Sequence, residues 1–188
     1  IARSNEAKLL GIKMGTPAFK NHHIFKKYGV TIFSTNFSLY GDFSNRVMLI
    51  LSEAVPMIEI YSIDEAFLDY SGLPEPMEHS QALRNKVMQY TGIPVSIGIS
   101  STKTLAKVAN RIAKKEVKSG IFHLCCQHDI QECLKKLPAS KLWGVGRYYS
   151  KKLELYGIRT AYELTQRSDT WIQRHMSILG LKMVKELR

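Results

Sequence analysis

Residues 58–69 have the sequence IEIYSIDEAFLD, in which two β-like apolar runs flank an adjacent acidic pair, Asp64 and Glu65. Neighbouring side chains on a regular strand point to opposite faces, so two carboxylates that serve one centre need a turn or bulge between them. Residues 62–65 are predicted to form that turn. An acidic pair at the tip of a β-hairpin in a basic chain indicates carboxylates that hold metal ions beside a phosphate-binding surface, as in a nucleotidyl-transfer palm. A solvated acidic turn is the ordinary alternative.

The charge balance points to a polyanionic partner. The 188 residues include 27 Lys and Arg against 16 Asp and Glu, a formal net charge of +11, and such an excess favours nucleic acid. We expect no membrane partner, because the apolar runs are too short to span a bilayer and no basic amphipathic helix has an aromatic apolar side. The chain opens with Ile1 and shows no signal-peptide pattern. We expect it to be a fragment of a longer polypeptide.

The cysteines indicate a reducing compartment. Cys125, Cys126 and Cys133 are odd in number and two of them are adjacent, which does not make a disulfide framework and fits the cytosol. His123 and His128 lie nearby, but the spacing matches none of the usual structural zinc sites. We expect buried or idle thiols.

Strands and helices alternate along the first two thirds of the chain, which predicts one sheet with helices against a face. The expected strands cover residues 30–34, 57–61, 66–70, 95–100 and 121–124. The expected helices cover residues 5–10, 17–27, 39–54, 80–90 and 102–115. Beyond a boundary near residues 116–120 only short helices are expected, over residues 129–137, 147–156, 160–166 and 171–187, the last with a break near Gly180.

A basic stripe lies on the helix expected over residues 102–115. Lys103, Lys107, Arg111 and Lys114 lie three to four residues apart and share one face. Only Glu116 balances six basic residues in this region, and uncompensated positive charge indicates an absent anion. The N-terminal turn of this helix follows a strand, which would suit a triphosphate against Lys107. The alternative is a solvated face of like charges.

A second motif, LWGVGR, occupies residues 142–147 between two predicted helices. Gly144 and Gly146 allow a tight turn, and the helix that follows offers free N–H groups and the positive end of its dipole. Arg147, Lys151 and Lys152 add charge. This pattern indicates a helix-hairpin-helix, which holds a DNA strand through its phosphates. An ordinary turn between helices is the alternative.

Together these motifs resemble those of Y-family DNA polymerases. SIDEAF at residues 62–67 resembles the family's S-I-D-E-A-[FY] signature, and SIGIS with KTLAK, within residues 96–107, resembles its strand–helix segment. EAK and GIKMG, within residues 6–15, resemble its fingers motif. The resemblance is strongest to bacterial UmuC-type error-prone members and covers essentially the whole chain.

The resemblance implies an α+β fold with fingers over residues 1–34, a palm over 35–116 whose sheet carries helices on one face, and an all-α thumb over 117–188 with the helix-hairpin-helix. It implies error-prone translesion synthesis in the bacterial cytoplasm during the SOS damage response. The implied partners are primer-template DNA and deoxynucleoside triphosphates, and UmuC-type relatives also use a processed accessory subunit and a sliding clamp.

The resemblance also assigns roles to residues. Asp64 and Glu65 would be catalytic ligands of two Mg²⁺ ions, Lys107 a triphosphate contact, and Lys8 the fingers' basic residue near the incoming nucleotide. The DNA contacts would be Gly144, Gly146, Arg147, Lys151 and Lys152.

Two parts of the family pattern are missing from the sequence. A first palm strand with a further metal-binding Asp would precede residue 1, and a further DNA-gripping domain would follow residue 188. We therefore expect the fragment alone to be inactive.

Two other classes compete with this interpretation. A non-enzymatic helix-hairpin-helix DNA-binding module would rest on residues 117–188 alone, and its binding would respond to salt but not to nucleotide or Mg²⁺. A palm-type nucleotidyl cyclase would act on free nucleotides, and the glycine turn argues against it because a cyclase has no need to hold a duplex.

Overall fold

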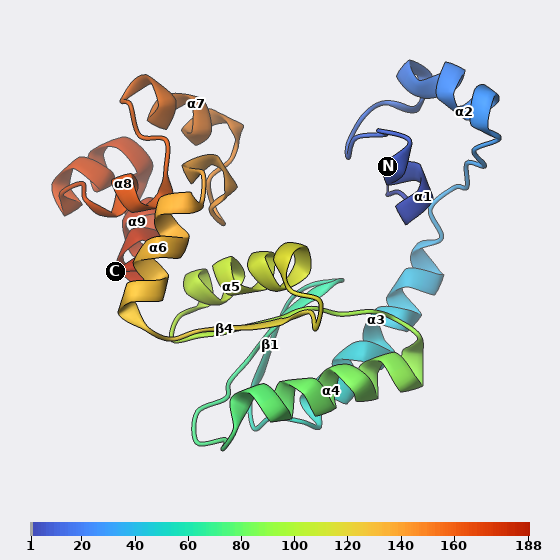
Figure 1. Cartoon of the computed structure of the whole chain (residues 1–188), viewed down its shortest axis with the longest axis horizontal. Helices are drawn as coiled ribbons and strands as arrows, with labels where there is room; N and C mark the ends of the chain where they lie inside the picture. Colours follow the sequence, from blue (N-terminus) through green and yellow to red (C-terminus); the bar gives the residue numbers. More distant parts are fainter. Residues whose placement is uncertain (1) are drawn as a thin grey trace. The chain divides into compact units, whose positions relative to one another are not determined.

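The computed structural model describes residues 2–188 and has a mixed α+β fold, which confirms the predicted class (Figure 1). The described chain divides into two compact units, of which one ends at Tyr40 and the other spans Gly41–Arg188. The division into fingers, palm and thumb stays a prediction.

The first unit contains the short helices α1 (Asn5–Leu9), the 3₁₀ helix η1 (Ala18–Asn21) and α2 (His22–Tyr28), and it ends within the first turn of the helix that follows. The single helix expected over residues 17–27 is therefore η1 followed by α2. The strand expected over residues 30–34 is wrong, because residues 30–36 are irregular. The apolar side chains that suggested it, Ile32 and Phe33, are 54% and 84% exposed. β propensity depends on a neighbouring strand to pair with and a surface to pack against.

In the second unit, helix α3 (Phe37–Ser52) leads to the predicted acidic hairpin. Strands β1 (Ile58–Ser62) and β2 (Glu65–Leu68) pair antiparallel, with Ser62 opposite Glu65 and a register shift between residues 60 and 62. The predicted turn is therefore tight and is accompanied by an irregularity at Tyr61. The Ser44 hydroxyl of α3 donates a hydrogen bond to the Ile63 carbonyl at 2.6 Å, which anchors the turn to this helix.

The other strands form a separate parallel pair. Strands β3 (Ile97–Ser100) and β4 (Ile121–Leu124) are joined through α5 (Lys103–Glu116), as a parallel connection requires. Figure 1 shows α5 on one side of this pair and α4 (Pro76–Thr91) on the other. Two details thus differ from expectation: the strands form two pairs instead of one sheet, and helices cover both faces of β3–β4.

Gly98 allows β3 to lie directly against α5. A Cβ at this position would overlap the backbone nitrogen of Asn110 and lie 2.5 Å from the carbonyl oxygen of Ala106. These are backbone atoms of a helix, so they cannot turn aside as a side chain would. The small face predicted for this strand is therefore a requirement for helix–strand contact.

Replacing Gly98 with alanine is expected to lower the free energy of unfolding by about 3 kcal/mol, the upper end of the range for overpacking. Gly41→Ala is the matched control, because a Cβ at Gly41, within α3, meets nothing within 4 Å. Alanine there should stabilise the helix by roughly 0.5–1 kcal/mol. Urea denaturation of the two variants measures both values, and equal effects would show that β3 and α5 are less closely packed than described.

Residues beyond β4 are helical. They form α6 (Gln127–Lys136), the 3₁₀ helix η2 (Ala139–Lys141), α7 (Arg147–Leu155), α8 (Ala161–Thr165) and α9 (Asp169–Leu187). Their apolar side chains share one core with Leu105 and Val108 of α5.

The last helix has a break, but not at the predicted residue. Ser177 has non-helical angles (φ 68°, ψ 179°), whereas the break was expected near Gly180. A Cβ at Gly180 would lie 2.5 Å from that of Met176. Gly180 therefore serves close packing within the helix, which the sequence did not distinguish from a helix break.

A carboxylate from α9 caps α5. The backbone N–H and the hydroxyl of Thr104 donate to Glu186 Oε2 at 2.9 and 2.6 Å, and the Thr102 hydroxyl donates to the Glu186 carbonyl at 2.8 Å. A negative charge at a helix N-terminus is stabilised by the helix dipole. The N-terminal turn of α5, expected to be open to a triphosphate, is therefore occupied by the protein's own carboxylate.

Replacing Glu186 with alanine is expected to destabilise the fold by about 2–3 kcal/mol, because the charge-assisted hydrogen bonds that Thr104 donates to the Glu186 carboxylate are lost. The control is Glu116→Ala at the C-terminal end of the same helix, which should change stability by no more than about 0.5 kcal/mol because this exposed residue has no ion pair among residues 2–188. Thermal unfolding followed by circular dichroism compares them. If Glu186→Ala and Glu116→Ala unfold at the same temperature, the cap contributes nothing to the stability of the fold.

Candidate active site

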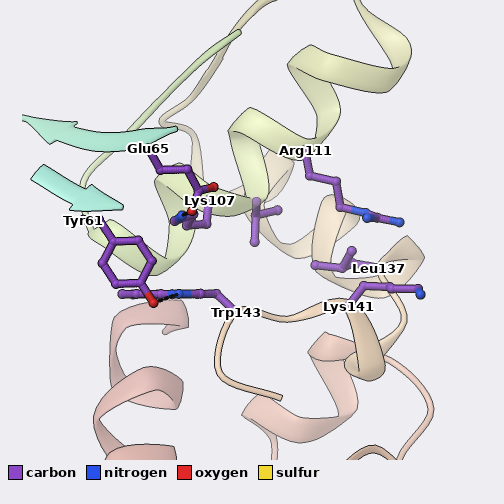
Figure 2. A pocket seen from close by; sticks show the side chains of 8 residues that line it. Tyr61, Glu65, Lys107, Arg111, Leu137, Lys141 and Trp143 are labelled. Carbon is purple, nitrogen blue, oxygen red and sulfur yellow. Dashed lines mark hydrogen bonds and ion pairs between the residues drawn. The ribbon is translucent and has the colours of Figure 1, made fainter. Parts of the chain in front are cut away.

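A pocket of about 370 Å³ lies between the acidic hairpin, α5 and the segment around η2 (Figure 2). Its lining is rich in charged and aromatic side chains and consists of Tyr61, Glu65, Lys107, Val108, Arg111, Leu137, Lys141 and Trp143. Three of these side chains are cationic and one is a carboxylate. The pocket therefore carries an excess of positive charge.

Glu65 and Lys107 form an ion pair inside this pocket. Lys107 Nζ lies 2.8 Å from Glu65 Oε2, and the two side chains are 16% and 41% exposed. Glu65 opens strand β2 immediately after the turn, and Lys107 lies in the second turn of α5. The structure thus brings together one residue of the acidic pair and one residue of the basic stripe.

Three aromatic rings surround the Lys107 ammonium. Its Nζ lies 4.8 Å from the ring centroid of Tyr61, 5.3 Å from that of Phe67 and 5.5 Å from that of Trp143. Trp143 Nε1 donates to the Tyr61 hydroxyl at 3.1 Å, which joins the glycine-turn segment to the hairpin. Aromatic faces stabilise a partly desolvated cation electrostatically. No motif in the sequence indicated these rings, although Glu65 and Phe67 are two residues apart on β2 and so share its face.

Another part of the basic stripe is also neutralised by the hairpin. Lys103 forms an ion pair with Glu59, and its Nζ lies 5.3 Å from the Phe67 ring centroid. The positive charge of Lys103 and Lys107 is therefore compensated by carboxylates of β1 and β2, which corrects the expectation that Glu116 alone balances this region. Arg111 and Lys114 have no carboxylate within ion-pair distance among residues 2–188.

Asp64 lies apart from these contacts. Its carboxylate is exposed at the turn, where it accepts a hydrogen bond from the Ser62 hydroxyl at 2.7 Å. It is not among the residues that line the pocket. Within residues 2–188 no group of three or more His, Cys, Asp or Glu side chains is placed to hold a metal ion. The structure therefore brings Glu65, but not Asp64, into the pocket.

The predicted nucleotide residue Lys8 lies on α1 in the first unit. Its side chain is exposed, and Nζ donates to Asn5 Oδ1 at 2.9 Å.

The glycine turn joins η2 to α7. Gly144 adopts a left-handed φ of +86°, and Gly146 immediately precedes α7, whose first turn has no side-chain cap. Arg147 and Lys151 are exposed. Lys152 differs from them, because its Nζ donates to the His175 carbonyl at 2.9 Å. Four of the five predicted DNA contacts thus lie on an open surface, and Lys152 is held against α9.

The cysteines lie outside this pocket. Cys125 and Cys126 are exposed and Cys133 is half-buried, all three as free thiols. Burial raises the pKa of the Cys133 thiol, and the neighbouring Asp129 carboxylate adds to the increase. No helix within residues 2–188 combines the length and the apolar character that crossing a bilayer requires.

Comparisons with known proteins identify the family. The sequence model of the impB/mucB/samB family matches residues 1–111. Protein UmuC of Salmonella typhimurium is 44% identical over 193 residues, and Protein SamB of the same species is 39% identical; each match covers 100% of this chain and 46% of the relative. DNA polymerase IV 2 of Mesorhizobium japonicum is 32% identical over 88% of this chain and 40% of the relative. The chain thus spans less than half the length of these relatives.

Solved structures of DNA polymerases also match this chain. An insertion ternary complex of Dbh DNA polymerase matches with a TM-score of 0.82 and 25% identity, over 98% of this chain and 54% of that chain. DinB from Sulfolobus solfataricus matches with a TM-score of 0.77 and 25% identity, over 97% and 53%. The resemblance to UmuC-type, Y-family proteins is confirmed. Because the family model matches more than half of the residues of this chain, the chain belongs to the impB/mucB/samB family.

Proposed function

We propose that the protein containing this chain is a template-directed DNA polymerase of the error-prone, translesion type. It would join the 3′-hydroxyl of a primer to the α-phosphorus of a deoxynucleoside triphosphate. The observation that carries the proposal is the Glu65–Lys107 pair in a positively charged pocket, within a fold that matches a ternary complex of Dbh DNA polymerase.

Asp64 and Glu65 would hold the catalytic metal. Their carboxylate oxygens are the hard donors that Mg²⁺ prefers, and the Lys107 ammonium 2.8 Å from Glu65 supports a cation position beside this carboxylate. Two bound Mg²⁺ ions would activate the primer hydroxyl and neutralise charge on the departing pyrophosphate.

Lys107 and Lys8 would contact the nucleotide. Lys107 is held on the rigid helix α5 with 16% of its side chain exposed, so few rotamers remain to be lost when a phosphate is bound. In that state its ammonium would turn from Glu65 to the triphosphate. Lys8 is exposed on α1, and within residues 2–188 its side chain has an amide oxygen as hydrogen-bond partner and no ion pair, which leaves its charge available.

The glycine turn would hold the primer-template DNA. The open N-terminus of α7, with Gly144, Gly146, Arg147 and Lys151, offers backbone donors and positive charge to phosphates. Lys152 would join them only by leaving the His175 carbonyl.

The cellular setting rests on the resemblance to UmuC-type proteins. It comprises the bacterial cytoplasm, the SOS response, a processed accessory subunit and a sliding clamp.

Primer extension by the full-length protein tests the proposal. We expect incorporation that requires Mg²⁺ and stops when the metal is removed with a chelator. Salt-dependent DNA binding that neither nucleotide nor Mg²⁺ affects would instead favour a non-enzymatic DNA-binding module. Residues 1–188 alone should show no extension, because no group of three or more His, Cys, Asp or Glu side chains within residues 2–188 is placed to hold a metal ion.

A further inference from the structure

We propose that Arg111 and Lys141 together hold one phosphate group at the side of the pocket away from Glu65. The phosphate belongs either to the DNA backbone or to a nucleotide, and the experiment below separates these sources. The inference rests on the proposed function, since it supposes a nucleic-acid or nucleotide substrate. It concerns two residues that are distinct from the acidic pair and from the glycine turn.

The charge in the pocket is divided between a neutralised end and an uncompensated end. Glu65 neutralises Lys107 at 2.8 Å, whereas Arg111 and Lys141 line the same pocket without a carboxylate in ion-pair distance among residues 2–188. Two unpaired cations on one pocket repel each other in the absence of an anion. A bound anion removes that repulsion and gains attraction from both.

The two cations come from opposite walls and point the same way. Figure 2 shows Arg111 leaving α5 and Lys141 leaving η2, with both charged ends on the side of the pocket away from Glu65. A guanidinium offers a planar fork of donors to phosphate oxygens, and an ammonium adds a compact charge. One phosphate between them would satisfy both groups.

Both side chains start from rigid backbone. Arg111 follows Val108 and precedes Ile112 on α5, and these two residues pack into the main core. Lys141 ends η2, whose position is fixed by hydrogen bonds from Lys141 N–H to the Pro138 carbonyl and from Ala139 N–H to the Arg159 carbonyl, each at 2.9 Å. The separation of the two chain positions therefore does not depend on a mobile loop, and little backbone entropy is lost on binding.

The surroundings favour a DNA backbone phosphate over a nucleotide. Lys141 precedes the exposed turn of Gly144 and Gly146 by only three residues, and the uncapped start of α7 follows directly. A strand that contacts the turn could place a neighbouring phosphate between Arg111 and Lys141.

The test uses the full-length protein and a fluorescent primer-template. The variants Arg111→Gln, Lys141→Gln and the double variant are titrated at several KCl concentrations. The slope of log affinity against log salt is negative, and each lost phosphate contact reduces its magnitude by about one. We expect each single variant to lose about one, and the double variant to lose no more, because the phosphate is bound only when both cations hold it.

Arg174→Gln is the matched control, since Arg174 is an exposed cation on α9 outside the pocket lining. It should leave the slope close to that of the wild type. The charge-conserving variant Arg111→Lys should keep most of the slope that Arg111→Gln loses relative to the wild type, which separates a charge effect from misfolding. The inference is wrong if the salt slopes of Arg111→Gln and Lys141→Gln equal that of Arg174→Gln and nucleotide affinity is also unchanged. It is also wrong if the slope losses of the two single variants add in the double variant.

A second titration measures nucleotide affinity for the DNA-bound protein. Reduced DNA slopes with unchanged nucleotide affinity assign the phosphate to the DNA backbone, and the reverse assigns it to the nucleotide. The inference and the proposed function can fail separately. A wild-type protein that extends no primer yet shows the non-additive loss of slope would refute the polymerase proposal and keep the phosphate site.

Discussion

Replacing Asp64 with alanine in the full-length protein is expected to reduce primer extension by at least about a thousandfold while leaving DNA affinity largely intact. A metal centre supplies several kcal/mol of transition-state stabilisation, and about 1.4 kcal/mol corresponds to a tenfold change in rate. The Asp64 carboxylate is exposed, and its hydrogen-bonding partner is the Ser62 hydroxyl on the same turn. Its removal therefore leaves no buried group unpaired, and the fold should not suffer.

The control for this prediction is Asp69→Ala on the same hairpin. The Asp69 carboxylate accepts a hydrogen bond from the Ser71 N–H at 2.9 Å, beyond the end of β2. Hydrogen bonding to the Ser71 side chain, and then to this N–H, lowers the pKa of Asp69 below its usual value. We expect this variant to retain extension within a few fold. Single-turnover primer extension and fluorescence anisotropy compare the two. A loss of DNA binding as large as the loss of synthesis would assign Asp64 to the structure of the turn instead of to the metal.

Replacing Lys107 with alanine is expected to raise the nucleotide concentration for half-maximal extension by roughly tenfold to a hundredfold, because a charge-assisted hydrogen bond is worth about 1.5–3 kcal/mol. The ion pair with Glu65 and the three rings around the ammonium add a second consequence. Alanine removes the stem of the side chain as well as its charge, so the rings lose contacts.

Lys107→Met separates these two effects. Methionine keeps an apolar stem of similar length against Tyr61, Phe67 and Trp143 but carries no charge, so it should match alanine in nucleotide dependence and exceed it in stability. Lys115→Ala, an exposed lysine on the same helix outside the pocket lining, is the control. Steady-state kinetics over a range of nucleotide concentrations provides the comparison. An unchanged nucleotide dependence in both Lys107 variants would contradict the assigned role.

Local patterns predicted the hairpin and the strand–helix–strand unit well. The acidic turn is short and bounded by alternating apolar residues, and Thr102 caps α5 at the residue where the sequence changes from strand to helix. These features depend on neighbours within a few residues. For the same reason the strand expected over residues 30–34 was wrong, since an apolar run does not specify whether another strand lies beside it.

The candidate site was only partly predictable, because its partners are distant in the chain. The spacing of the basic stripe placed Lys107 on one helix face, but the sequence did not pair it with Glu65, 42 residues earlier. Trp143 bonds to Tyr61 across 82 residues, and Glu186 caps α5 across a similar distance. Nothing in a short window marks such contacts. The packing of helices α5–α9 around one core brings Glu186 to α5, whereas the hairpin that carries Tyr61 and Glu65 lies outside that core.

The contact of Glu186 with the first turn of α5 has a mechanical consequence. These hydrogen bonds fasten the end of α9 to α5, the helix that carries Lys107. A force applied along α9 would therefore reach that lysine through two helices. Ser177 interrupts α9 upstream of these hydrogen bonds and is the point where such a load can be relieved by bending.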